Sequence, residues 1–83
     1  MRALVVEDDV ALREQLQAGL VGAGFVVDGA GDGMEAEYFG LEYPYDVAVV
    51  DLGLPRRDGM AVIRRLRDRG CRYPILILTA RDN

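Results

Sequence analysis

Three runs of four residues are apolar at every position, and they constrain the fold of this chain more than any other feature. They lie at 3–6, 47–50 and 75–78, and a weaker apolar run lies at 25–27. Continuous apolar runs of this length are typical of strands that are buried on both faces, as in parallel sheets. The sequence therefore predicts a parallel sheet that helices cover on both sides.

A stretch with helical spacing follows the first run. Asp8 or Asp9 can cap the start of this helix, and Gly22 and Gly24 can end it. Its small and apolar residues recur every three or four positions, as one buried stripe requires. That stripe consists of Leu12, Leu16, Gly19, Leu20 and Ala23.

Two further helices are predicted over 33–42 and 59–69, ended by Pro44 and Gly70 respectively. Their expected buried residues are Ala36, Phe39 and Gly40 in the first, and Met60, Ile63 and Leu66 in the second. The order of elements is β-α-β-α-β-α-β, which predicts a doubly wound α/β fold with right-handed crossovers. Ligands of such folds bind beyond the carboxyl ends of the strands.

Composition excludes several classes of site. The 83 residues suffice for one small domain, and their 10 basic and 14 acidic residues give a net charge of −4. Without histidine there is no imidazole metal site or catalytic triad, and the single Cys71 excludes an internal disulfide and a cysteine-rich zinc site. An acidic chain is a poor nucleic-acid binder by itself. No signal peptide or membrane span is recognisable, so a cytoplasmic location is expected.

Acidic and hydroxyl side chains follow three of the four predicted strands. Glu7, Asp8 and Asp9 follow the first run, Asp51 follows the run at 47–50, and Thr79 follows the last. Taken singly, these residues have ordinary explanations as a helix cap, a turn residue and a strand end. Taken together, they predict one acidic site at the carboxyl edge of the sheet. Because Mg²⁺ prefers oxygen ligands, it is the cation that best fits such a site.

The motifs at these strand ends resemble a known family. The segments ALVVEDD, YDVAVVDLGLPRRDGM and PILILTARDN, spread over the whole chain, are similar to those of response regulator receiver domains. The forms VEDD and DLGLP are most similar to the OmpR/PhoB subfamily, whose receivers precede a winged-helix DNA-binding domain. The resemblance implies a flavodoxin-like (CheY-like) fold and a two-component signalling switch rather than an enzyme.

The resemblance also implies a role for each matching residue. Asp51 would accept a phosphoryl group from a sensor histidine kinase, and Thr79 would contact that group and move upon phosphorylation. Mg²⁺ would bind to Asp8, to Asp51 and to the backbone carbonyl of Gly53, and through water to Glu7. A receiver assists its own phosphorylation and dephosphorylation, and its active form would favour dimerisation and DNA binding in the intact regulator.

The chain departs from the family pattern in its extent. Receivers continue through a fourth helix, a fifth strand and a fifth helix, which carry a lysine and a switch aromatic, whereas this chain ends at Asn83 and contains no lysine. The resemblance thus implies that 1–83 is an incomplete receiver, with DNA binding left to an absent C-terminal domain. Without a fifth strand, 75–78 becomes an apolar edge, which predicts a homodimer or an exchange of elements between chains.

Two alternatives to the signalling switch follow from the same residues. A phosphatase with an aspartate nucleophile would carry Asp-x-Asp after the first strand, and the run Asp8-Asp9-Val10-Ala11 does not fit that pattern. A pure interaction module, which associates with itself or another chain without metal or phosphorylation, is the second alternative.

Overall fold

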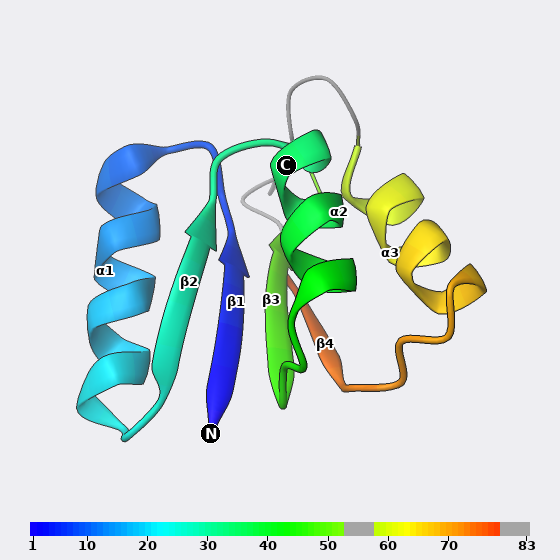
Figure 1. Ribbon diagram of the computed structural model, residues 1–83. Helices are drawn as coiled ribbons and strands as arrows, with labels where there is room; N and C mark the ends of the chain where they lie inside the picture. Colours follow the sequence, from blue (N-terminus) through cyan, green and yellow to red (C-terminus); the bar gives the residue numbers. More distant parts are fainter. Residues whose placement is uncertain (53–57, 79–83) are drawn as a thin grey trace.

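The computed structural model describes residues 1–52 and 58–78, in which strands and helices alternate (Figure 1). The predicted order of elements is confirmed. The elements are β1 (Arg2–Val6), α1 (Val10–Gly22), β2 (Val26–Ala30), α2 (Gly33–Glu42), β3 (Val47–Asp51), α3 (Gly59–Asp68) and β4 (Ile75–Leu78). No helix in the described residues is long and apolar enough to cross a membrane.

The four strands form one parallel sheet in the order β2-β1-β3-β4. The predicted fold class is therefore confirmed, a flavodoxin-like α/β sheet with β4 as the last described strand. The register matters for function, because Val6 lies opposite Ala30 on one side and Val50 on the other. The residue that follows β1, Glu7, thus comes level with Asp51 at the end of β3.

Helices lie on both sides of the sheet (Figure 1). One face meets α2 and α3 in the main core, while α1 covers β1 and β2 on the other side. Alternate residues of β1 and β3 point into the main core, as the pleat of a strand requires. The fully buried side chains of that core include Leu4, Val6, Val50, Val62 and Leu66.

An aspartate caps the start of each helix. The Leu12 amide donates to Asp9 at 3.1 Å, and the Glu35 amide donates to Asp32 at 2.8 Å. Asp58 accepts in the same way from the first turn of α3. These side chains satisfy amides that have no partner within the helix. Because Asp9 is the cap of α1, the Asp8 carboxylate stays available at the sheet edge.

The predicted buried stripes differ from the structure in two helices. No residue of α1 is fully buried, and its leucines are only half-buried. In α3 the prediction was wrong for Met60, which is 38% exposed, whereas Val62 is fully buried. The buried positions of α3 are Gly59, Val62 and Leu66, spaced by three and four residues, and this spacing stays on one helix face better than 60, 63 and 66.

The strands also differ in detail from the apolar runs. The prediction ended the second strand at Val27, but β2 continues to Ala30 and includes Asp28. The Asp28 carboxylate tolerates this position because it accepts hydrogen bonds from the Tyr45 hydroxyl at 2.8 Å and from Arg2 Nε at 3.1 Å. Among the described strands β4 lies at the edge of the sheet, and its Leu76 and Ile77 are 59% and 50% exposed.

Candidate functional site

Three carboxylates meet at the carboxyl edge of the sheet. Glu7 and Asp8 come from the end of β1 and Asp51 from the end of β3, and one oxygen of each lies within 4.8 Å of the others. Glu7 is buried, Asp51 is half-buried and Asp8 is exposed. The acidic cluster predicted from the strand ends is confirmed for these three residues, and Asp9 serves as a helix cap.

The environment of Glu7 disfavours its charge. The side chain is only 4% exposed, and this burial is the main cause that raises the pKa of its carboxyl group. The neighbouring Asp51 and Asp8 raise the Glu7 pKa further, while a hydrogen bond from the Asp9 amide at 3.0 Å opposes the rise. A cation bound in the cluster would offset the repulsion between the three negatively charged carboxylates.

Glu7 is held by its backbone as well as by its side chain. Its amide donates to the Ala30 carbonyl at 3.0 Å, and its carbonyl accepts from the Arg13 guanidinium at 2.9 Å. The end of β1 is therefore attached both to β2 and to α1. This attachment fixes where the acidic side chains project.

The end of β3 lies directly against the start of α3. The Gly59 amide donates to the Leu52 carbonyl at 3.0 Å. A Cβ atom on Gly59 would lie 2.5 Å from the Asp51 carbonyl oxygen and 2.7 Å from Leu52 Cα, which is too close for any side chain. The helix can thus approach the Asp51 backbone only because residue 59 is glycine.

Other predicted site residues lie outside the described part of the chain. These are Gly53, expected to offer a backbone carbonyl to the metal, and Thr79, expected to contact the phosphoryl group. Their roles remain predictions.

The donor set of the cluster fits Mg²⁺. All its side-chain donors are carboxylate oxygens, and their crowding is the condition that a hard divalent cation relieves. The soft ligands that favour zinc are not among them, because the sequence has no histidine and Cys71 lies near the opposite edge of the sheet. The cluster therefore fits Mg²⁺ both by the chemistry of its donors and by their spacing.

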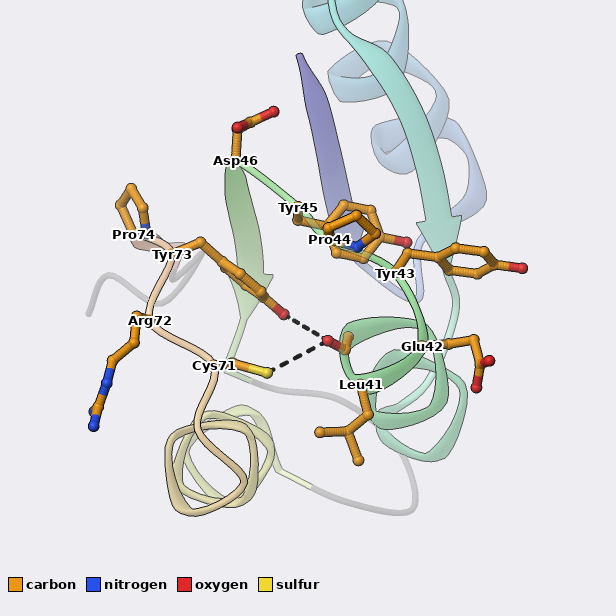
Figure 2. A pocket seen from close by; sticks show the side chains of 11 residues that line it. Leu41, Glu42, Tyr43, Pro44, Tyr45, Asp46, Cys71, Arg72, Tyr73 and Pro74 are labelled. Atoms are coloured by element: carbon orange, nitrogen blue, oxygen red, sulfur yellow. Dashed lines mark hydrogen bonds between the residues drawn. The ribbon is translucent and has the colours of Figure 1, made fainter.

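A hollow lies at the opposite, amino end of the sheet (Figure 2). The α2–β3 and α3–β4 connections line it with aromatic, proline and charged residues. The Tyr73 hydroxyl and Cys71 Sγ both donate to the Gly40 carbonyl, at 3.0 and 3.5 Å, and so join the α3–β4 connection to the last turns of α2. No sequence pattern predicted this hollow, because its tyrosines have no regular spacing.

A parallel flavodoxin-like sheet with a carboxylate cluster at the carboxyl ends of its strands is the arrangement that the receiver motifs predicted. Residues 3–83 match the family described as the response regulator receiver domain. The chain belongs to this family, as the motifs predicted.

Curated relatives are similar in sequence to this chain over its whole length. The transcriptional regulatory protein PhoP of Escherichia coli (strain K12) is 49% identical over 83 residues, which are 100% of this chain and 37% of that protein. The chain thus spans about a third of the length of the curated relatives it matches.

Solved structures of receivers also have the same fold. The Francisella response regulator 1452 receiver domain has a TM-score of 0.91 at 30% identity, covering 99% of this chain and 68% of its own. TrrA of Thermotoga maritima, solved in complex with Mg²⁺-BeF, has a TM-score of 0.91 at 32% identity, with coverages of 98% and 70%.

Two residues near the cluster were not connected with it by the bottom-up reading of the residues. Arg13 contacts the Glu7 backbone, but an arginine in an amphipathic helix carries no sequence signal for such a contact. Gly59 was predicted from the residues as a helix start, and the family resemblance implied that it shapes the loop after Asp51; its close contact with the Asp51 backbone follows from the packing of α3. The one sequence signal that could have pointed to this close approach is an aspartate followed by glycine, Asp58-Gly59, at the helix start.

Proposed function

We propose that the chain accepts a phosphoryl group on Asp51 from a sensor histidine kinase. The observation that carries this proposal is the cluster of Glu7, Asp8 and Asp51, in which three carboxylates from two strand ends lie within 4.8 Å. An Asp51 oxygen would attack the phosphorus atom, and the bond from phosphorus to the imidazole nitrogen of the donor would break. Asp51 suits this role better than Glu7 because Asp51 is half-buried and so open to a donor, whereas Glu7 is buried.

The same residues would hold Mg²⁺. Asp8 and Asp51 would bind the ion directly, Glu7 would bind it through water, and the Gly53 carbonyl would complete the protein ligands. When bound, the ion neutralises the carboxylates and the charge that develops on the phosphoryl oxygens. Thr79 would donate a hydrogen bond to one of those oxygens and shift upon phosphorylation. TrrA, crystallised with Mg²⁺-BeF, supports such a site by its similar fold.

The output would be transcriptional control in the cytoplasm. PhoP, at 49% identity, is named a transcriptional regulatory protein, and this chain corresponds to 37% of it. Phosphorylation would bias the receiver between two arrangements, and the active arrangement would favour dimerisation. DNA contacts would belong to a winged-helix domain outside these 83 residues, because the chain itself carries a net charge of −4.

Intact-mass spectrometry with acetyl phosphate and Mg²⁺ tests the proposal. We expect the mass to rise by one phosphoryl group, and we expect Asp51→Asn to abolish the rise. Asp68→Asn is the matched control, because it removes one exposed carboxylate from α3 and leaves the cluster intact. A folded wild-type chain that gains no mass, or a gain that survives Asp51→Asn, contradicts the proposal.

A second function, self-association without phosphorylation, is favoured by β4. This strand has only β3 as a neighbour among the described strands, and its Leu76 and Ile77 side chains are 59% and 50% exposed. An apolar edge with unpaired backbone groups is a template for pairing with another chain.

Sedimentation over a range of concentrations tests this second function. We expect a dimer at high concentration that Ile77→Lys shifts to monomer, because a lysine at an edge opposes strand pairing. Val26→Lys, at an exposed position on the other edge strand, is the control. A wild-type chain that stays monomeric at the highest concentration contradicts self-association.

A further inference from the structure

The Arg13 side chain links α1 to the turn that carries the acidic cluster. It projects from the first turns of the helix, and its Nη1 atom donates to the Glu7 carbonyl at 2.9 Å. A hydrogen bond with a charged donor is stronger than one between neutral groups. The contact is made to the backbone carbonyl of Glu7 and not to its carboxylate.

This contact completes the fixation of Glu7. The Glu7 amide is bound to Ala30, its carboxylate accepts from the Asp9 amide, and Arg13 holds its carbonyl. That carbonyl belongs to the peptide plane that joins Glu7 to Asp8. Its orientation therefore sets the direction in which the exposed Asp8 side chain leaves the backbone.

Gly31 provides the space in which the guanidinium lies. A Cβ atom on Gly31 would stand 3.1 Å from Arg13 Nη1 and 3.9 Å from Glu35 Oε1. The Gly31 amide donates to that Glu35 oxygen at 2.8 Å, so the turn between β2 and α2 is fixed independently. An added methyl group would displace Arg13, the far end of a flexible side chain, rather than the turn.

We propose that Arg13 is a positioning residue for the divalent cation site, acting through the Glu7 carbonyl in the space left by Gly31. The inference rests on the proposed function, since it needs Mg²⁺ at the cluster. Partners that orient metal ligands in this way typically contribute on the order of tenfold or more to metal affinity.

The sign of the effect separates positioning from simple charge. Removing a cation near an Mg²⁺ site would tighten Mg²⁺ binding by lowering the repulsion. Removing a positioning contact would weaken it. Arg13→Met loses both the charge and the hydrogen bond, so the direction of its change decides which effect dominates.

Isothermal titration of Mg²⁺ into the full chain at 0.5 M NaCl is the test, because salt screens the charge effect. We expect Arg13→Met to weaken Mg²⁺ binding by about tenfold. Arg13→Lys, which keeps a cationic donor, should retain part of the affinity. Arg69→Met is the charge-matched control, because Arg69 is exposed at the far end of α3, and it should bind as the wild type does.

Gly31→Ala gives an independent route to the same contact. It leaves every charge in place and should also weaken Mg²⁺ binding. In the Arg13→Met background it should have no further effect, because its target is already absent; such non-additivity marks two residues that act through one contact.

Thermal midpoints in EDTA accompany each titration, since a merely structural role would lower the midpoint and leave the affinity of the folded chain unchanged.

Three outcomes would overturn the inference. The first is Arg13→Met binding Mg²⁺ as tightly as the wild type or more tightly. The second, which also serves if Arg13→Met does not fold, is wild-type affinity in both Arg13→Lys and Gly31→Ala. The third is a wild-type chain that binds no Mg²⁺, and this outcome also removes the metal from the proposed function, whereas the first two leave it intact.

Discussion

At the scale of single residues, Glu7 is the position where function and stability oppose each other. Its carboxyl group is buried beside Asp8 and Asp51, and burial is the main reason that its pKa is raised. A side chain selected for stability alone would be neutral here. A buried carboxyl group that lies beside two further carboxylates and accepts from the Asp9 amide is in an environment that the proposed cation would make more favourable.

The Glu7→Gln variant makes this opposition measurable. A carboxyl whose pKa is raised in the folded state favours folding when protonated, and this contribution is lost as pH rises through the folded pKa. In EDTA at neutral pH, the permanently neutral glutamine should therefore give a higher thermal midpoint than glutamate. The advantage should disappear as pH falls below the ordinary glutamate pKa of 4.5.

Thermal melts from pH 4 to pH 8 check this expectation. Glu14→Gln, an exposed change on α1, is the matched control and should show no such pH-dependent gain. A Glu7→Gln chain that is less stable than the wild type at pH 7 would show that the carboxylate is compensated without metal.

At the scale of elements, the approach of α3 to β3 depends on Gly59. We expect Gly59→Ala to destabilise the chain by about 1–3 kcal/mol, because the new methyl group overlaps the backbone of Asp51 and Leu52. Gly19→Ala, in open space within α1, should instead stabilise it by about 0.5–1 kcal/mol through helix propensity. Urea unfolding of both variants gives the two free energies, and equal effects of the same sign would contradict this account of the packing.

The elements also show how far sequence patterns reach. Apolar runs located β1, β3 and β4 within one residue, and the candidate caps Asp8 and Asp9 located the start of α1, because these signals are local. The strand ends likewise predicted the meeting of Glu7, Asp8 and Asp51, since parallel strands share one carboxyl edge. The extension of β2 through Asp28 was missed, because the partners Arg2 and Tyr45 are distant in sequence.

Contacts between helices and strands were not predictable for the same reason. The burial of Val62 in place of Met60 depends on how α3 is rotated against the sheet, and periodicity leaves that rotation uncertain by one position. The contact of Arg13 with the Glu7 carbonyl depends on the path of the turn between them. Neither the burial of Val62 nor the contact of Arg13 can be recognised from the composition of the neighbouring sequence.

At the scale of the whole molecule, an 83-residue chain has little stability to spare, so a bound ion changes its balance strongly. A ligand at 100 times its dissociation constant stabilises the folded state by about 2.7 kcal/mol. For a domain of this size each 1 kcal/mol shifts the midpoint by roughly 4–8 °C. Saturating Mg²⁺ should therefore raise the thermal midpoint by about 10–20 °C.

General screening would also stabilise a chain of net charge −4, so the site must be separated from its surroundings. Na⁺ at matched ionic strength supplies the screening without a divalent ion, and it should shift the midpoint far less than Mg²⁺. Asp8→Asn should remove the difference between the two salts, while Asp68→Asn, which removes the same single negative charge, should preserve it. If both variants keep the difference, Mg²⁺ acts somewhere other than the cluster, and the link between the acidic edge and the stability of the whole chain fails.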